Sequence, residues 1–85
     1  MTVNLYSVRD VHSGFGQVFT SQNDAVAIRE FRLAISRKDN VMYSSPNDFD
    51  LMRLGSFDAD LGTIEPCAPT IIANAYSIAK EFGDV

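Results

Sequence analysis

Cationic side chains gather in one stretch of an otherwise acidic chain. The 85 residues hold seven Lys and Arg against eleven Asp and Glu, a net charge of −4. Four of the seven cations fall within residues 29–38, namely Arg29, Arg32, Arg37 and Lys38. Such a cluster can neutralise phosphate groups, although a protein that coats nucleic acid by charge alone is expected to be basic. The sequence therefore predicts a modest, salt-sensitive site for a polyanion.

Three aromatic residues are candidates for stacking on nucleic-acid bases. Proteins that hold single strands combine cations for the phosphates with aromatic faces for the bases. Tyr6, Phe15 and Tyr43 are these candidates. A plainer interpretation stays open for both groups, with the arginines on a solvated helix face and the aromatic rings in the core or at its rim.

Residues that could carry catalysis are isolated from one another. His12 is the single histidine, and Cys67, flanked by Pro66 and Ala68, is the single cysteine, so no intrachain disulfide can form. Residues 58–62 resemble part of a calcium loop but lack the third oxygen donor and the closing glutamate. No glycine-rich phosphate loop is present. We therefore expect no enzyme activity, metal site or cofactor.

The cationic residues fall on the clearest predicted helix, Asn23–Ile35. Asn23 or Asp24 can cap its first turn. Val26 and Leu33 are seven residues apart and lie together on the opposite side of this helix. They are either two ordinary exposed apolar residues or part of a contact with another subunit. The core-facing residues repeat at spacings of three and four and are Ala27, Ile28, Phe31, Ala34 and Ile35.

Short strands surround this helix in the sequence. A polar connection, Asp39–Asp48, precedes the second half of the chain, where Gly62 can adopt the positive φ of a tight turn and Pro66 and Pro69 are expected to end the sheet. Arg53 shares a strand face with aromatic residues. The predicted strands are Thr2–Arg9, Gln17–Thr20, Phe49–Phe57 and Thr63–Glu65.

A second helix is predicted over Thr70–Phe82. Its broad apolar band includes Ile72 and Tyr76 and is expected to dock on the sheet or on another subunit. The order along the chain is then β-β-α-β-β-α. We expect an α+β fold in a single domain, residues 1–85, with a small antiparallel sheet and one or two helices packed on it.

Several segments between Leu5 and Pro69 follow one recognisable pattern. They are LYSVRD (Leu5–Asp10), Gly14-Phe15-Gly16, NDAVAIREF (Asn23–Phe31), PNDFDLMRLGSFD (Pro46–Asp58), Gly62 and Pro66. Together these segments resemble the small nonstructural protein of gokushoviruses, the single-stranded DNA phages of the Microviridae. The resemblance implies a DNA-binding role in genome synthesis or in the switch from replication to packaging, without a residue-level binding motif.

Two functions stay open at this point. One is a non-enzymatic binder of single-stranded DNA, and the other is a module that binds host replication or capsid-assembly proteins without touching DNA. Because a chain of this size has a small core, we also expect a homodimer or a higher homo-oligomer. Its interface would use Val26, Leu33, Ile72 and Tyr76. No run of about 20 apolar residues predicts a membrane span, so the expected location is the host cytoplasm.

Overall fold

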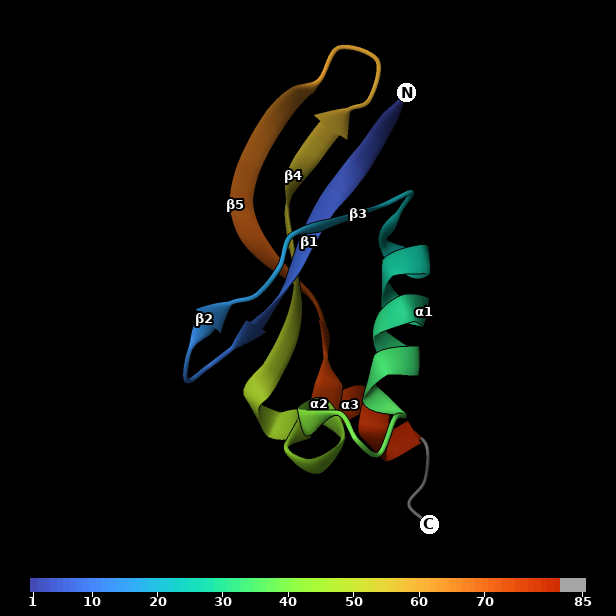
Figure 1. The fold of residues 1–85 in the computed structure, drawn as a ribbon, viewed down its shortest axis with the longest axis vertical. Coiled ribbons are helices and arrows are strands. Elements are labelled where there is room, and N and C mark those ends of the chain that lie inside the picture. Colours follow the sequence, from blue (N-terminus) through green and yellow to red (C-terminus); the bar gives the residue numbers. More distant parts are fainter. Residues whose placement is uncertain (82–85) are drawn as a thin grey trace.

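A five-stranded antiparallel sheet with helices packed against it forms the protein (Figure 1). The computed structural model describes residues 1–81. Strand β1 is central, pairing with β2 and β3 along one edge and with β4 along the other, and β5 lies beyond β4. The predicted α+β class is confirmed. The elements are β1 (Thr2–Asp10), β2 (Gly14–Phe15), β3 (Phe19–Ser21), α1 (Asp24–Ile35), α2 (Val41–Ser44), the 3₁₀ turn η1 (Pro46–Asp48), β4 (Phe49–Asp58), β5 (Thr63–Asn74) and α3 (Ala75–Glu81).

Helix α1 forms as its sequence pattern predicts. Asn23 is the cap, since its side chain accepts a hydrogen bond from the Val26 backbone N–H at 2.9 Å. Ala27, Phe31 and Ile35 are buried at three- and four-residue spacing. They belong to one hydrophobic cluster with residues from the sheet, α2 and α3: Tyr6, Met42, Phe49, Leu51, Ala75 and Ile78. The core therefore lies between α1 and one face of the sheet.

The prediction that the sheet ends at the prolines was wrong. Strand β5 continues through Pro66 and Pro69 as far as Asn74, so α3 begins at Ala75 rather than at Thr70. The physical reason is that β5 is an edge strand, where a residue without an N–H removes no ladder hydrogen bond on the open side. The predicted helix end at Phe82 lies outside the described residues.

Two predicted connections also contain regular structure. The polar segment Asp39–Asp48 holds α2 and η1, because the Asn40 side chain accepts from the Met42 N–H at 2.8 Å and caps a short helix. The predicted loop Asp10–Gly16 contains β2, which pairs back on β1. Both features are shorter than the windows over which hydrophobic periodicity can be recognised.

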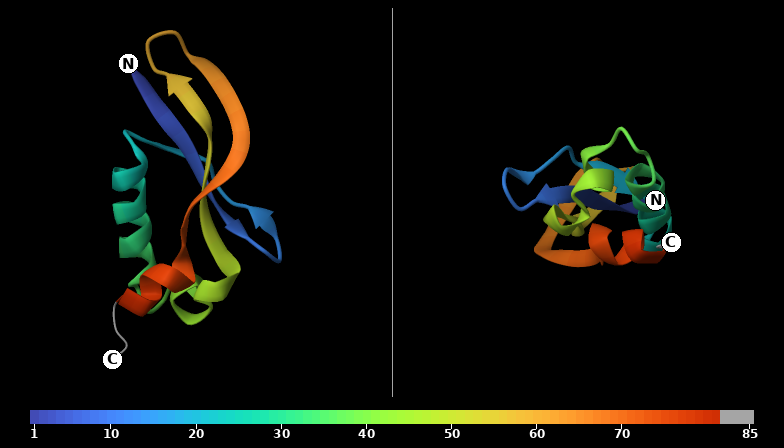
Figure 2. Two further views of the ribbon diagram at one scale, coloured as in Figure 1. Left: turned by 180° about the vertical axis from the view of Figure 1, so that it is seen from behind. Right: turned by 90° about the horizontal axis from the view of Figure 1, so that it is seen from below.

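The hairpin of β4 and β5 extends past the N-terminal end of α1, and β5 bows outward (Figures 1 and 2). The molecule is therefore elongated, with extents of 46 × 24 × 20 Å and a radius of gyration of 13.4 Å. A compact domain of this length has a radius near 12 Å. We call the protruding part the arm and define it as Thr2–Leu5 of β1, Gly55–Asp58 of β4 and Thr63–Pro66 of β5.

Candidate nucleic-acid interface

Three of the predicted phosphate-binding cations are exposed along α1 and the turn after it. Arg29, Arg37 and Lys38 are all exposed. Within residues 1–81, none of the three forms an ion pair with a carboxylate. Their charges are available to an incoming anion. Arg29 lies on α1, whereas Arg37 and Lys38 follow the end of the helix at Ile35.

Arg32 differs from these three cations. Its Nη1 lies 2.8 Å from Oε1 of Glu81 on α3, and its side chain is partly buried. A nearby carboxylate already offsets its charge, so Arg32 is a weaker candidate for phosphate contact than Arg29, Arg37 and Lys38. The pair instead contributes to the docking of α3 beside α1.

The remaining arginines hold the sheet and helix together. Arg9 pairs with Asp50 at 2.7 Å, and Arg53 pairs with Asp24 at 2.5 Å. Asp50 also accepts a hydrogen bond from the Asn74 side chain at 2.8 Å, which ties β5 to β4 near the base of the sheet. These charges are thus used inside the fold. Lys80 on α3 is exposed but lies over the Tyr76 ring, so Arg29, Arg37 and Lys38 are the candidate site.

Of the three stacking candidates, only Tyr43 lies near the cations. It is 46% exposed and sits on α2, directly after the turn that carries Arg37 and Lys38. That turn is held by backbone hydrogen bonds from Asn40 to Arg37 and from Tyr43 to Asn40. Phe15 is 47% exposed but belongs to β2, on the far side of the sheet from α1 (Figures 1 and 2).

The proposal of Tyr6 as a stacking residue was wrong, because its side chain is fully buried. Its hydroxyl donates to Asp24 at 2.6 Å and accepts from the Asn4 side chain at 3.0 Å, and its ring stacks on Phe19. Burial, followed by the bond to Asp24, raises the pKa of the Tyr6 hydroxyl. The alternating pattern of β1 places Tyr6 on one face but does not say which face α1 covers.

Asp24 is the shared acceptor of this network. The Tyr6 hydroxyl bond, and after it the Arg53 guanidinium, hold the pKa of the Asp24 carboxyl below its usual value. The carboxylate is therefore ionised at neutral pH and joins β1, β4 and the first turn of α1. Its charge at this end of α1 also makes the helix N-terminus unsuitable for a phosphate.

Acidic residues lie close to the free cations in the sequence. Glu30 and Asp39 are both exposed, one beside Arg29 and the other beside Lys38. The surface formed by Arg29, Arg37, Lys38 and Tyr43, which we call the α1 surface, is therefore only mildly positive. Its electrostatic attraction for a polyanion should be modest and easily screened by salt.

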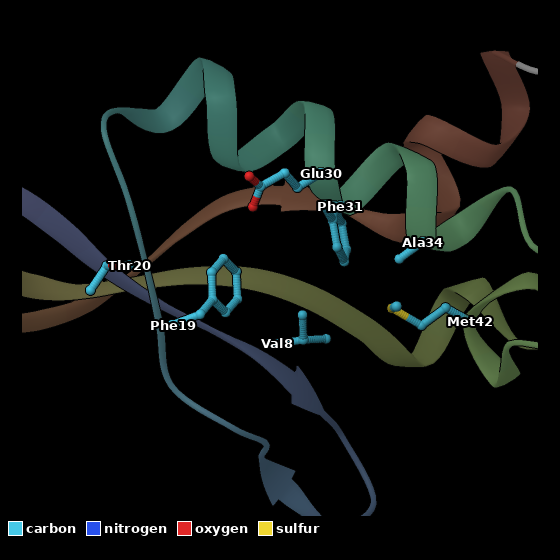
Figure 3. Close-up of a pocket in the computed structure, with 7 residues that line it drawn as sticks. All are labelled: Val8, Phe19, Thr20, Glu30, Phe31, Ala34 and Met42. Carbon is cyan, nitrogen blue, oxygen red and sulfur yellow. The ribbon is translucent and has the colours of Figure 1, made fainter.

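An apolar recess of about 330 Å³ opens between α1 and the sheet (Figure 3). The side chains of Phe19, Phe31, Val8 and Met42 point into the same space, and Glu30 is the single charged residue of its lining. One carboxylate without an acid, base or nucleophile beside it does not make a catalytic constellation. The full lining is Val8, Phe19, Thr20, Glu30, Phe31, Ala34 and Met42.

The histidine and the cysteine lie apart from other reactive groups. His12 Nε2 lies 3.4 Å from Asp48 Oδ2 on the surface, and Cys67 is an exposed thiol on β5. Among residues 1–81, no three His, Cys, Asp or Glu side chains are grouped so that they could hold a metal ion. In the same part of the chain, no helix is long and apolar enough to cross a membrane.

The four predicted interface residues lie on three elements, α1, β5 and α3. Val26 is half-buried and Leu33 is 60% exposed, both on α1. Ile72 lies on β5 and packs partly against the core, whereas Tyr76 on α3 is 43% exposed, with the Lys80 ammonium 5.4 Å from its ring centre.

These features define a small α+β protein whose described residues show surface charges and apolar faces rather than clustered reactive groups. The chain belongs to the phage ORF5 protein family, whose model matches residues 3–78. A comparison with curated proteins found no match, and a comparison with solved structures found none either. The family identifies a phage protein without specifying what it binds.

Proposed function

We propose that this protein is a non-enzymatic phage nonstructural protein that binds single-stranded DNA through the α1 surface. The observation on which this proposal rests is that Arg29, Arg37 and Lys38 form no ion pair with a carboxylate among residues 1–81, whereas Arg9, Arg32 and Arg53 do. Membership of the phage ORF5 family supports the part of this proposal that makes it a phage protein. The resemblance to gokushovirus nonstructural proteins implies that the DNA is a single-stranded phage genome. It also implies that the protein acts in genome replication or packaging, in the host cytoplasm.

The strength of such binding follows from the number of cations. Three neutralised phosphates give a slope of about −2 in a plot of log K against log salt, because each single-strand phosphate contributes about −0.7. Tyr43 would stack on one base beside the neutralised phosphates. The affinity should therefore be modest at low salt and lost near physiological salt.

Fluorescence anisotropy of a labelled oligothymidylate tests the proposal at several salt concentrations. The Arg37→Ala/Lys38→Ala variant should bind more weakly at low salt, and its salt slope should be shallower by roughly 1.4, since two phosphate contacts are lost. Arg32→Ala is the control, because it removes a positive charge that Glu81 already offsets. No binding by the wild type at low salt, or equal losses per charge in both variants, would refute the α1 surface as the site.

A second candidate function is a protein-interaction module that acts without DNA contact. Exposed apolar side chains on and beside β5 favour it, since Leu61 is 75%, Ile64 60% and Ile71 57% exposed. Where exposed apolar side chains adjoin one another, they are typical of protein contact sites. Recovery of a defined host or phage protein after nuclease treatment, together with no change in oligonucleotide anisotropy, would select this function over DNA binding.

A further inference from the structure

Glu30 lies at the rim of the apolar recess between α1 and the sheet, with its carboxylate on the Thr20 side (Figure 3). It is exposed, and it forms no ion pair with any residue of the described chain, 1–81. Charged side chains pair along a helix at spacings of three and four residues. At those spacings Glu30 has only uncharged neighbours, namely Val26, Ala27, Leu33 and Ala34. The carboxylate is therefore available to accept hydrogen bonds from a bound molecule.

A second hollow, of about 320 Å³, adjoins the recess and has a more polar lining. Thr20 and Glu30 line both spaces, so the two meet at these residues. Arg29, one of the three cations without a carboxylate partner among residues 1–81, lines the second hollow together with Ser21 and Gln22. An apolar recess, an unpaired acceptor and an unpaired cation therefore follow one another along one side of α1.

These three features set three requirements for a ligand. The recess of about 330 Å³ is at the small end of ligand sites, and its apolar walls, which include Val8, Phe19 and Met42, suit one flat ring system. The carboxylate accepts hydrogen bonds and donates none, so the edge of that ring must carry donors. The cation requires an anionic group attached to the same ligand. A fatty acid fails the second requirement and a simple amine the third, whereas a nucleotide with a donor-bearing base meets all three.

We propose that the recess binds one guanine base of a single strand, with the N1–H and 2-amino groups of guanine on the Glu30 carboxylate and a neighbouring phosphate at Arg29. Two adjacent donors that match two carboxylate oxygens form a bidentate, charge-assisted pair. Adenine and cytosine have an acceptor nitrogen beside the amino group, and thymine has a carbonyl on each side of its N3–H, so each sets an acceptor against the carboxylate. The strand as the source of the base rests on the proposed function, whereas the choice of guanine rests on the recess itself.

Nuclear magnetic resonance titration of the full ¹⁵N-labelled chain with deoxynucleoside monophosphates tests the recess without a strand. Titration to about 10 mM reaches dissociation constants in the millimolar range. The guanine nucleotide should shift the amide signals of Thr20, Glu30 and Phe31 and bind more tightly than the adenine nucleotide. The hypoxanthine nucleotide lacks only the 2-amino group and should bind roughly tenfold more weakly than the guanine nucleotide, because one hydrogen bond to a charged group is lost. Equal binding of the three nucleotides, or shifts confined to other residues, would overturn the proposal.

Glu30→Gln should abolish the preference for guanine over hypoxanthine, because the amide presents one acceptor and one donor instead of two acceptors. Removing a negative charge also strengthens the binding of any phosphate, so the measured quantity is the ratio of the two dissociation constants. Asp39→Asn is the matched control, since it removes an exposed carboxylate near Lys38 and should leave the ratio unchanged. A ratio that survives Glu30→Gln, or that falls equally in Asp39→Asn, would refute Glu30 as the group that recognises the base.

Fluorescence anisotropy of an oligothymidylate with one central guanine extends the test to the strand. This strand should bind more tightly than the same strand with a central hypoxanthine, and Glu30→Gln should remove the difference. Strand binding without any such difference would refute the guanine site while leaving the α1 surface as the DNA-binding site. Binding of the guanine nucleotide at the recess without strand binding would refute the proposed function and keep the guanine site. Binding of neither would overturn both.

Discussion

The Arg53 guanidinium on β4 lies 2.5 Å from the Asp24 carboxylate in the first turn of α1. The other oxygen of the same carboxylate accepts the Tyr6 hydroxyl of β1 at 2.6 Å. One side chain thus connects a central strand, its neighbour and the helix. The network sits where the arm leaves the helix-covered part of the sheet, so it fixes how α1 meets the sheet at that end.

Replacing Tyr6 by Phe should destabilise the protein by about 1–2 kcal/mol, because a buried hydrogen bond to a charged acceptor is lost while the ring stays in place. Thermal unfolding monitored by circular dichroism measures the change. Tyr76→Phe, which alters an exposed tyrosine on α3, should change stability by less than about 0.5 kcal/mol. If the Tyr6→Phe variant were as stable as the wild type, the hydrogen bond from the Tyr6 hydroxyl would make no net contribution to the free energy of unfolding.

The sequence pattern anticipates part of this network. The alternation of Phe49, Leu51 and Arg53 places a charge on the helix-covered face, and a partly buried charge calls for a partner. The pattern cannot say that the partner is Asp24, whose position also suits the helix dipole. A contact between residues 29 positions apart depends on the register of β1 against β4, which tertiary packing decides.

The same limit explains the errors at β5. The sequence predicts Thr70–Asn74 to be the start of a helix, because its apolar residues continue the pattern of α3. In the structure these residues instead pair with Asp50–Arg53 in the sheet. Pairing with an ordered strand outweighs local helix propensity, which amounts to less than about 1 kcal/mol per residue for ordinary residues. In contrast, α1 was predictable because its cap and its buried stripe agree.

The Asp24 carboxylate should make stability depend on pH in the acid range. Its folded-state pKa lies below its ordinary value of 3.8, so its contribution is fully present above that value and is lost as the pH falls through the folded pKa. The stability difference between the wild type and Asp24→Asn should therefore be largest near neutral pH and shrink below pH 3.8. Urea unfolding at a series of pH values measures it.

The control for this pH series is Asp39→Asn. Asp39 is exposed, and no ion pair within residues 1–81 involves it. Its replacement should change stability little at neutral pH. A difference between the wild type and Asp24→Asn that stays constant down to the lowest pH would contradict the assignment of a lowered pKa to Asp24.

Gly55 should tolerate no side chain. A Cβ there would lie 2.3 Å from the backbone oxygen of Glu65 and 2.9 Å from Cα of Pro66, and its φ is +157°. The position adjoins the bulge at which Leu54 has no partner on β1. Gly55→Ala should cost about 2–4 kcal/mol through overpacking and backbone strain, whereas Gly16→Ala, with its nearest contact at 3.5 Å, should be nearly neutral. Comparable melting temperatures for the two variants would contradict this account.

Tyr43 should supply most of the non-electrostatic part of any single-strand affinity. Stacking on one base is worth about 1–3 kcal/mol by alanine substitution, so Tyr43→Ala should weaken oligothymidylate binding by roughly 5- to 150-fold. Tyr43→Phe keeps the ring and should bind nearly as well as the wild type. Because stacking releases no counterions, the salt slope should stay the same in both variants, unlike in Arg37→Ala/Lys38→Ala.

Phe15→Ala is the control for a comparably exposed ring on the far side of the sheet. Weakened binding in Phe15→Ala with none in Tyr43→Ala would move the base contact from α2 to the β1–β2 hairpin.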